Sequence, residues 1–238
     1  MGPMRVWDKQ APPSIGKDGG RHHAGHASGR RAALVGAASA LAVFAVPSRP
    51  ARAALHCVRA DPYGTEYCQA GIDNRIRSVA ASQWNSQWCW AACISAVFAF
   101  HGFDVDQRRI VEATYGRIVN LPAHGPAIAA ATSREWTTDD GRRFRAHCDV
   151  LWDSQFHVGR PSAAADAARE LAQDQPLIIG TGGHAMVLTA MSYVRYPNGA
   201  GEPKEAVVRD PWPGRGRRSL SAQEWYGTSF LARFRAVA

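Results

Sequence analysis

Residues 83–93 read QWNSQWCWAAC, and a helix is predicted to begin inside this stretch. Small and apolar residues recur there at helical spacing and continue until Gly102, the expected end of the helix. Asn85 or Ser86 is the expected N-cap, since short polar side chains accept hydrogen bonds from the first free N–H groups. Cys89 therefore falls in the first turn of the predicted helix.

A helix start favours the reactive form of a cysteine. A thiol attacks as the thiolate, and the unpaired N–H groups and the macrodipole supply positive potential there. Gln83 precedes Cys89 by six residues, so the loop is short enough to bring its amide back over the helix start. That amide and the Cys89 backbone N–H would form an oxyanion hole. Gln87 is the alternative donor, although its position favours the helix surface.

A histidine that opens an apolar strand is the candidate base. The run PLII at 176–179 is followed by Gly180-Thr181-Gly182-Gly183, and His184 then begins a second apolar run. Glycines ahead of a histidine let a substrate backbone pass close by. We therefore take His184 as the general base, and Gly182 and Gly183 as candidate cleft residues.

A hairpin is predicted after His184. The chain runs to Tyr196, turns through residues 197–203 and returns through residues 206–210. The first residue of the outgoing strand should face the last residue of the returning strand, so Asp210 becomes a neighbour of His184. A carboxylate there would fix the imidazole tautomer and stabilise the imidazolium ion. The expected catalytic triad is Cys89, His184 and Asp210.

Three segments in this order resemble the bacterial papain-like cysteine peptidases, which include the double-glycine leader peptidases and plant-pathogen effector cysteine proteases. The segments are 88–92, 176–191 and 210–211. Gln83 matches the glutamine that such peptidases carry six positions ahead of the cysteine. Asp210 stands where papain has asparagine, which points to the bacterial branches. The resemblance implies a papain-like fold and cysteine endopeptidase activity on a protein or peptide substrate.

The tryptophans beside the cysteine have two interpretations. Trp88 and Trp90 are expected to pack around the helix start, and a wall of the substrate cleft is their alternative use. An isolated cysteine is more often a small core residue than a nucleophile. The joint presence of Gln83, His184 and the following strand favours the catalytic interpretation of Cys89.

The N-terminal 53 residues have the features of an export signal. A polar, basic lead is followed by fifteen small and apolar residues at 32–46, too few to span a bilayer. The small residues Ala51 and Ala53 favour cleavage between Ala53 and Ala54. We expect a secreted or periplasmic protein without a stable membrane anchor. Arg30-Arg31 suits the twin-arginine route, and an ordinary secretory signal with an overextended N-terminus is the equal alternative.

The charge of the chain resides mostly in this signal. The full chain has 28 Lys plus Arg, 20 Asp plus Glu and a net charge of +8. Residues 1–53 hold eight of the basic and two of the acidic residues, so the remainder carries +2. A nucleic-acid partner is therefore not expected. The basic clusters at 142–145 and 215–218 are expected in solvated loops, with selection of an acidic substrate as the alternative.

Four cysteines remain besides the candidate nucleophile. Cys57 and Cys68 are the first expected disulfide in an oxidising compartment. Cys93 lies one helical turn beyond Cys89, so it points into the core and either meets Cys148 or stays a buried thiol.

Metal and cofactor sites are not expected. No second close pair of Cys or His completes a tetrahedral zinc site with Cys89 and Cys93. The glycines at 180–183 lack the Lys-Ser or Lys-Thr of a phosphate loop, and a strand follows them instead of a helix.

The remainder suits a single domain. Residues 54–75 are expected to be a loop-rich lead-in, and residues 76–238 the peptidase domain. Helices are predicted at 104–115, from Gly125 and at 162–173, and strands at 144–152, from Pro176, in the hairpin and at 230–237. Helices precede most strands, so the fold class is α+β: an N-terminal helical half carrying the cysteine helix and a C-terminal antiparallel sheet half, with a cleft between.

The predicted function is that of a secreted, monomeric cysteine peptidase with a Cys-His-Asp triad. An acyltransferase or amidase acting on cell-wall peptide would use the same triad, because fold and triad do not dictate the acceptor. A non-catalytic secreted binding module is the third interpretation.

Overall fold

The computed structural model describes residues 53–77, 82–155, 158–159 and 164–238. The predicted export signal lies outside the described residues, except for Ala53. The helices are η1 (Asn74–Arg77, a 3-10 helix), α1 (Cys89–Phe100), α2 (Gln107–Tyr115), α3 (Gly125–Thr132), α4 (Ala164–Ala172) and α5 (Ala222–Tyr226). The strands are β1 (Ala54–Arg59), β2 (Glu66–Gly71), β3 (Glu135–Thr137), β4 (Arg143–Asp153), β5 (Val158–Gly159), β6 (Leu177–Thr181), β7 (His184–Arg195), β8 (Gly201–Asp210), β9 (Gly216–Ser219) and β10 (Thr228–Val237).

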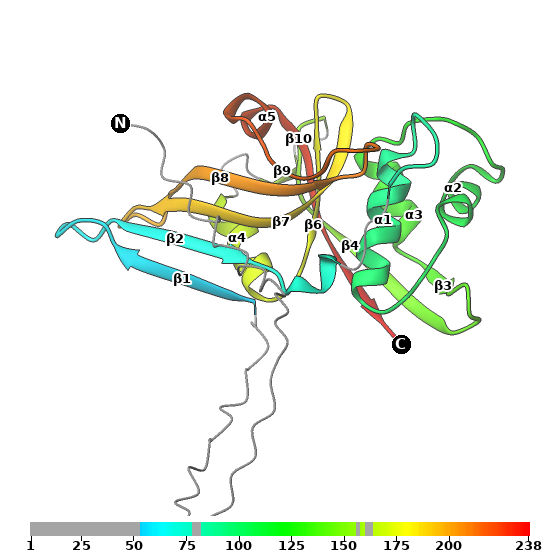
Figure 1. Cartoon of the computed structure of the whole chain (residues 1–238), viewed down its shortest axis with the longest axis horizontal. Coiled ribbons are helices and arrows are strands. Elements are labelled where there is room, and N and C mark those ends of the chain that lie inside the picture. The colour runs from blue at the N-terminus through cyan, green and yellow to red at the C-terminus, as the bar shows by residue number, and fades with distance from the viewer. Residues whose placement is uncertain (1–52, 78–81, 156–157, 160–163) are drawn as a thin grey trace, which may run out of the picture. The chain divides into compact units, whose positions relative to one another are not determined.

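One antiparallel sheet joins the strands of the described residues. Its main order is β1-β2-β7-β6-β10-β4-β3, while β8 pairs with β7 and β9, and β5 pairs with β4. Helices α1, α2 and α3 gather at one end of this sheet, away from the β1–β2 hairpin (Figure 1). The predicted α+β fold, with a helical half and an antiparallel sheet half, is confirmed.

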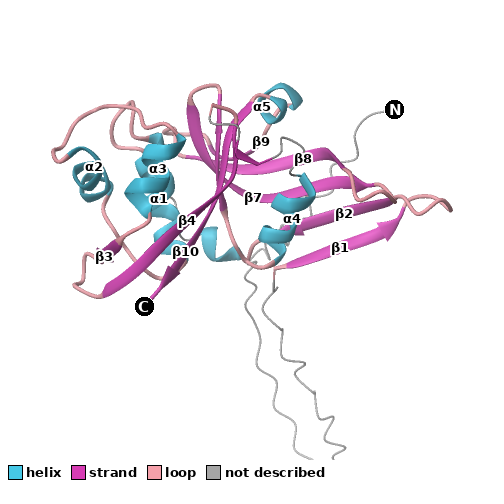
Figure 2. Ribbon diagram, turned by 180° about the vertical axis from the view of Figure 1, so that it is seen from behind, coloured by secondary structure: helices cyan, strands magenta, loops and turns pink. Residues whose placement is uncertain are grey.

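The central strand β7 is buried on both faces. Ala185 and Val187 belong to the apolar cluster that includes most of α1. Met186 and Leu188 belong to a second cluster, formed with the alanine-rich α4. Figure 2 shows α4 lying across the strands on the side from which that view is taken. Because β7 needs apolar residues on both faces, its sequence is a nearly continuous apolar run.

The cysteine helix begins later than predicted. Its first residue is Cys89 and its N-cap is Trp88, not Asn85 or Ser86. The reason is a tight turn ahead of the helix, in which the Trp88 N–H donates to the Asn85 carbonyl oxygen at 3.1 Å. The Ser86 hydroxyl instead accepts from the Asn120 amide at 2.9 Å. Cys89 is thereby at the helix tip.

The other predicted helices are present with small shifts at their starts. Helix α2 begins at Gln107 and not at residue 104, because the Asp106 carboxylate caps it by accepting from the Arg108 N–H at 2.7 Å. Gly116 ends α2 in the left-handed conformation, with φ 70°. Helix α3 begins at Gly125 with proline in its first turn, as predicted.

Residues 54–75 are not loop-rich as expected, since most of them form the β1–β2 hairpin. Cys57 and Cys68 are directly opposed in its register, with Cα atoms 4.1 Å apart, and form a disulfide. The predicted Cys57–Cys68 bond is confirmed. The strands were missed because β1 has few buried residues, so its alternation of apolar and polar residues is weak. Strand β2 pairs with β7 and extends the sheet.

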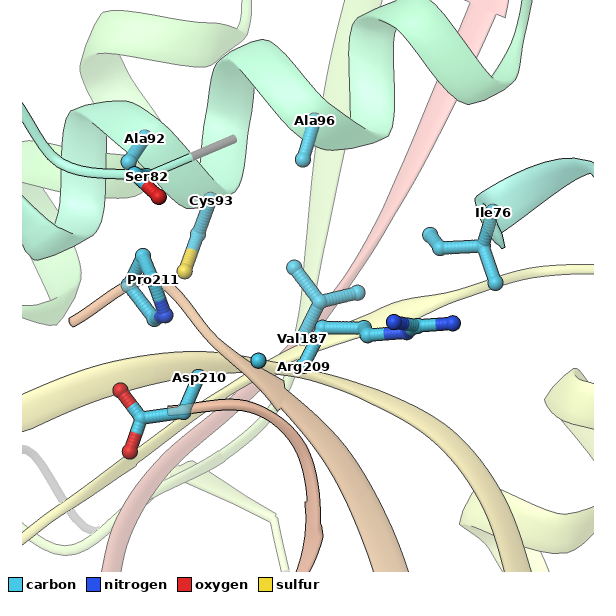
Figure 3. Close-up of a pocket in the computed structure, with 10 residues that line it drawn as sticks. Ile76, Ser82, Ala92, Cys93, Ala96, Val187, Arg209, Asp210 and Pro211 are labelled. Carbon is cyan, nitrogen blue, oxygen red and sulfur yellow. The ribbon is translucent and has the colours of Figure 1, made fainter. Parts of the chain in front are cut away.

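Of the two alternatives for Cys93, a disulfide with Cys148 is wrong. Cys93 and Cys148 are both buried free thiols. Cys93 directs its sulfur toward Pro211 (Figure 3), whereas Cys148 lies on β4. The alternative, that Cys93 is a buried thiol, is confirmed. Among the described helices, none is long and apolar enough to cross a membrane.

Candidate active site

A two-residue turn places His184 at the first position of β7. Thr181 and His184 are the last pair of the β6–β7 ladder, and Gly182 and Gly183 connect them. These glycines have φ of 57° and 76°. Two consecutive left-handed residues are typical of the type I′ hairpin turn, which suits the twist of the flanking strands. The glycines therefore set the start of the strand that carries His184.

His184 and Asp210 meet as predicted. The imidazole Nε2 lies 2.7 Å from Asp210 Oδ1. The two residues are not directly opposed, because Val187 pairs with Arg209, which leaves Met186 opposite Asp210. His184 is two residues from Met186, so it lies diagonal to Asp210 on the same face of the sheet. Without the register shift between Leu188 and Ala190, Asp210 would stand opposite Val187, so this bulge places Asp210 on the same face as His184.

The Asp210 carboxylate is held from several directions. Its side chain is fully buried. Oδ1 also accepts from the Trp212 N–H, and Oδ2 accepts from Arg218 Nε, both at 2.9 Å. Burial alone would raise the pKa of Asp210, but the hydrogen bonds from His184, Trp212 and Arg218 bring that pKa below its ordinary value. Asp210 is therefore ionised at neutral pH.

The Cys89 thiol and the His184 imidazole line the same cleft, and each shifts the pKa of the other. Because Asp210 occupies Nε2, the ring nitrogen left for the sulfur is Nδ1. Burial opposes ionisation of the thiol, but His184 and the backbone N–H groups of Ala185 and Trp90 outweigh it and lower the pKa of Cys89. The interaction with Cys89 raises the pKa of His184, and Asp210 raises this pKa further. Burial of the imidazole acts in the opposite direction, but the pKa of His184 stays above its ordinary value. Both shifts favour a thiolate–imidazolium pair.

Gln83 lies just ahead of the helix but does not aim its amide at Cys89. It is 6 % exposed, and its backbone N–H donates to the Pro211 carbonyl oxygen at 2.8 Å. Its Nε2 donates to the carbonyl oxygens of Asn85 and Ser86, at 2.9 and 3.0 Å. Its Oε1 is buried without a hydrogen-bond partner among the described residues. The alternative donor, Gln87, has an exposed side chain, as its surface position predicted.

A cleft of about 330 Å³ opens beside Cys89 and His184, between the helical residues and the sheet. Of the candidate cleft residues, Trp90 and Gly183 line it, whereas Trp88 and Gly182 do not. Trp88 is 1 % exposed because its indole is packed in the core and donates to the Val119 carbonyl oxygen at 2.7 Å. Gly182 serves the turn described above.

Two residues of the site were missed from the sequence. Arg218 of β9 bridges Asp210 and Glu224, and its Nη1 and Nη2 donate to the two Glu224 oxygens at 3.1 and 2.7 Å. The prediction of a solvated loop at 215–218 is therefore wrong for Arg218, because its side chain is only 24 % exposed. The ring of Trp212 meets His184 edge-on, with centroids 6.3 Å apart. Its place two residues after Asp210 was the available signal.

A second cavity, of about 60 Å³, lies between α1 and the β7–β8 strands. Ala92, Cys93 and Ala96 form its helix wall, and Val187, Arg209 and Asp210 lie across from them (Figure 3). It has room for a few water molecules at most. Burial raises the pKa of Cys93 well above its ordinary value, so this second thiol is not a nucleophile.

Metal ligands come together at one place among the described residues. The ligand atoms of Cys57, Glu66 and Cys68 lie within 4.8 Å of one another. Two of the three are the sulfurs of the disulfide, which are not thiolate ligands, and Glu66 binds Arg195. This group does not fit a metal ion.

The arrangement suits acyl transfer by a thiolate, and residues 76–233 match the model of the Peptidase_C39 like family. The chain belongs to the Peptidase_C39-like family. This membership confirms the prediction of a papain-like cysteine peptidase, and the family match includes Cys89, His184 and Asp210.

Two solved structures are similar to this member of the Peptidase_C39-like family. One is a double glycine motif protease from an AMS/PCAT transporter in complex with the leader peptide, with 13% identity, a TM-score of 0.40 and coverage of 66% of this chain and 91% of that chain. The other is the peptidase domain of Streptococcus ComA, a bi-functional ABC transporter involved in a quorum sensing pathway, with 13% identity, a TM-score of 0.39 and coverage of 66% and 96%. No curated protein matches the chain.

Proposed function

We propose that this protein is an exported cysteine peptidase that hydrolyses peptide bonds with a Cys89-His184-Asp210 triad. The single observation that supports the triad most strongly is the position of the imidazole, which lines the same cleft as Cys89 and lies 2.7 Å from Asp210 Oδ1. This is the arrangement in which a nucleophile, its base and an orienting group act together.

In the proposed reaction, the Cys89 thiolate attacks the substrate carbonyl carbon and forms a carbon–sulfur bond. The carbonyl π electrons move to oxygen. When the tetrahedral intermediate collapses, the carbon–nitrogen bond breaks and the His184 imidazolium gives its proton to the leaving amine. Water then attacks the thioester while His184 accepts a proton from it. Release of the acid restores the thiolate and the imidazolium, and Asp210 keeps the ring oriented throughout.

The proposed oxyanion hole consists of the Cys89 backbone N–H and the Gln83 amide. The Cys89 N–H belongs to the first residue of α1, where the backbone supplies positive potential. Gln83 would have to turn one amide hydrogen from the Asn85 or Ser86 carbonyl toward the reacting oxygen when substrate binds. Loss of one such donor costs about 10²–10³ in kcat, so Gln83→Ala should lower kcat by that factor and leave the labelling of Cys89 by electrophiles nearly unchanged.

The test of the peptidase proposal is the Cys89→Ala variant. Unfolded casein and purified peptidoglycan are each incubated with wild type or variant, and the products are read by mass spectrometry. We expect cleavage of casein by the wild type, no turnover by the variant and an unchanged melting temperature. Cleavage of peptidoglycan alone would replace the peptidase with an amidase, and undiminished casein cleavage by Cys89→Ala would remove Cys89 from the mechanism.

Export is also part of the proposal. It is supported by the signal-like segment at 1–53 and by the Cys57–Cys68 disulfide, because such bonds persist in oxidising compartments. N-terminal sequencing of protein from the periplasm or medium should find a mature chain beginning at Ala54. The double variant Arg30→Lys with Arg31→Lys distinguishes the two export routes. It should abolish export if the protein uses the twin-arginine route, and it should leave export unchanged if the protein uses the ordinary secretory route. A chain that stays in the cytoplasm with its N-terminus intact would contradict export.

A further inference from the structure

The first residue of α2 is a buried glutamine, and both polar atoms of its amide bind the backbone around Gln83. Gln107 is 3 % exposed. Its Nε2 donates to the Ser82 carbonyl oxygen at 2.9 Å, and its Oε1 accepts from the Trp84 N–H at 3.2 Å. The two bonds lie on either side of Gln83 in the chain. One side chain of α2 therefore holds both neighbours of the proposed oxyanion donor.

The packing of α2 fixes Gln107 in turn. The Asp106 side chain caps the helix, so Gln107 stands in its first turn. Ile110 and Val111, one turn further on, are fully buried and belong to the same apolar cluster as most of α1. Because Cys89 is the first residue of α1, this cluster joins α2 to the helix of the nucleophile. The amide of Gln107 is therefore a fixed partner, and fixed partners of this kind keep a site in its productive geometry.

The backbone of Gln83 is anchored, whereas its side chain is held at one end. Its N–H donates to the Pro211 carbonyl oxygen at 2.8 Å, which adds a third hydrogen bond to the two from Gln107. Its amide is bound through Nε2, by the Asn85 and Ser86 carbonyl oxygens, and Oε1 has no hydrogen-bond partner within the part of the chain that the structure describes. An amide on an anchored backbone can turn one hydrogen toward a reacting oxygen with little other movement.

We propose that Gln107 is a positioning residue for the oxyanion hole. It fixes the backbone of residues 82–84, so that the Gln83 amide meets the oxygen of the tetrahedral intermediate. The inference rests on the proposed function, with Cys89 as nucleophile and Gln83 as donor. A misplacement of about 1 Å can cost about 10²-fold in rate, so an anchor of this kind affects catalysis without touching the substrate. The competing interpretation is that Gln107 satisfies two backbone groups and supports the fold alone.

The test compares two reactions of Cys89 in the full-length protein. In the hydrolysis of p-nitrophenyl acetate, the sulfur attacks the ester carbonyl carbon and p-nitrophenolate leaves. Water then releases acetate from the thioester, and each half of the reaction passes through a tetrahedral oxyanion. Iodoacetamide labels Cys89 by displacing iodide from a saturated carbon, so no oxyanion forms. The ratio of ester turnover to labelling therefore measures the oxyanion hole separately from the reactivity of the thiol.

Gln107→Met keeps an unbranched side chain of similar length and removes both hydrogen bonds. We expect ester turnover to fall roughly tenfold and the labelling rate to change less than about twofold, after subtraction of the Cys89→Ala background. Gln83→Ala should lower turnover at least as much. The double variant should be no slower than Gln83→Ala, because Gln107 acts through Gln83. Two independent contributions would instead multiply.

Two further variants keep the comparison sound. Ser95 Oγ donates to the Val105 carbonyl oxygen at 2.8 Å, two residues before α2 begins. Ser95→Ala is therefore the matched control for loss of a hydrogen bond near the start of α2, and it should leave the ratio unchanged. Gln107→Glu keeps the acceptor for the Trp84 N–H and loses the donor to Ser82. If Gln107→Met does not unfold cooperatively, Gln107→Glu takes its place with the same expectation of a lowered ratio.

The outcomes separate this inference from the proposed function. An unchanged ratio in the Gln107 variant, or losses that multiply in the double variant, would overturn the inference. An unchanged ratio in Gln83→Ala would also overturn it, while Cys89-dependent turnover would keep the nucleophile. A wild type that hydrolyses the ester through Cys89 but cleaves no casein would contradict the peptidase and leave the inference in place. A wild type without Cys89-dependent ester turnover would overturn both.

Discussion

At the scale of single residues, the proposed chemistry depends on three side chains, Cys89, His184 and Asp210, whose pKa values are shifted by their neighbours. The Cys89 thiol is buried, which would keep it protonated, yet the interaction with His184 lowers its pKa. Local sequence predicted Cys89, His184 and Asp210, because each stands beside a recognisable helix start, strand start or strand end. Arg218 was not predicted, since its contact with Asp210 depends on β9 returning beside β8.

Removal of the negative charge of Asp210 and removal of the positive charge of Arg218 should move the pH profile in opposite directions. Asp210 raises the pKa of His184, so Asp210→Asn should shift the alkaline limb of kcat/KM to lower pH. Arg218 offsets the negative charge of Asp210, so Arg218→Gln should shift that limb to higher pH. Asparagine keeps an acceptor for the ring, so the loss of kcat in Asp210→Asn should stay within about 10²-fold.

The measurement is kcat/KM between pH 5 and 10 on one peptide for wild type and both variants. Arg218→Gln also removes a charged hydrogen bond from a buried carboxylate, so it should lower the free energy of unfolding by about 1–3 kcal/mol. Arg109→Gln, on an exposed ion pair, controls for the loss of an arginine. Shifts of the alkaline limb in the same direction for both site variants would contradict the electrostatic account.

At the scale of elements, the positions of helices and strands follow from the sequence more closely than their ends do. Helix α1 was predicted from its apolar run, but its cap was misplaced because backbone turns compete with side-chain caps. The β7–β8 hairpin was predicted, whereas the offset between His184 and Asp210 was not, since the sequence left open that Arg195 pairs with Gly201 at the turn.

The β6–β7 turn allows a test of how an element positions the base. Gly182 has φ 57°, and an added Cβ there meets nothing within 4 Å, so a substitution acts through the backbone alone. Asparagine tolerates the left-handed region, whereas a branched residue does not. Gly182→Val should lower the free energy of unfolding by about 1–2 kcal/mol and reduce kcat, and Gly182→Asn should stay close to wild type. Urea unfolding and turnover on one peptide measure both effects. Equal behaviour of the two variants would mean that the turn type does not matter.

At the scale of the whole molecule, α1 and the sheet bring together segments that are distant in sequence. The α+β class was predictable, because helices precede most strands. The lining of the cleft was not predictable, since the pairing of β4 with β10 brings Asp153 to Phe230, and the start of α3 places Gly125 beside both. The β1–β2 hairpin escaped prediction because its strands are short and partly exposed.

The disulfide should support the fold without supporting catalysis. Cys57–Cys68 closes a short loop, so Cys57→Ser with Cys68→Ser should lower the free energy of unfolding by about 2–3 kcal/mol. Strand β2 pairs with the far end of β7, at residues 190–195, so kcat should remain within about twofold. Urea unfolding with and without reductant measures the effect, and the reductant should destabilise wild type but not the double variant. Loss of turnover in the double variant with an unchanged free energy of unfolding would contradict the claim that the disulfide supports the fold and not catalysis.

The central claim is that Cys89 and His184 form a thiolate–imidazolium pair. Its most direct test is the pH dependence of alkylation by iodoacetamide. Cys57 and Cys68 are oxidised, and burial raises the pKa of Cys93 and brings that of Cys148 to about 12, so Cys89 is the reactive thiol. We predict that wild type is already alkylated rapidly at a pH below the ordinary thiol pKa. In His184→Ala, the pH at which the alkylation rate increases should be higher. A wild-type profile that follows an ordinary thiol and does not change in His184→Ala would contradict the account.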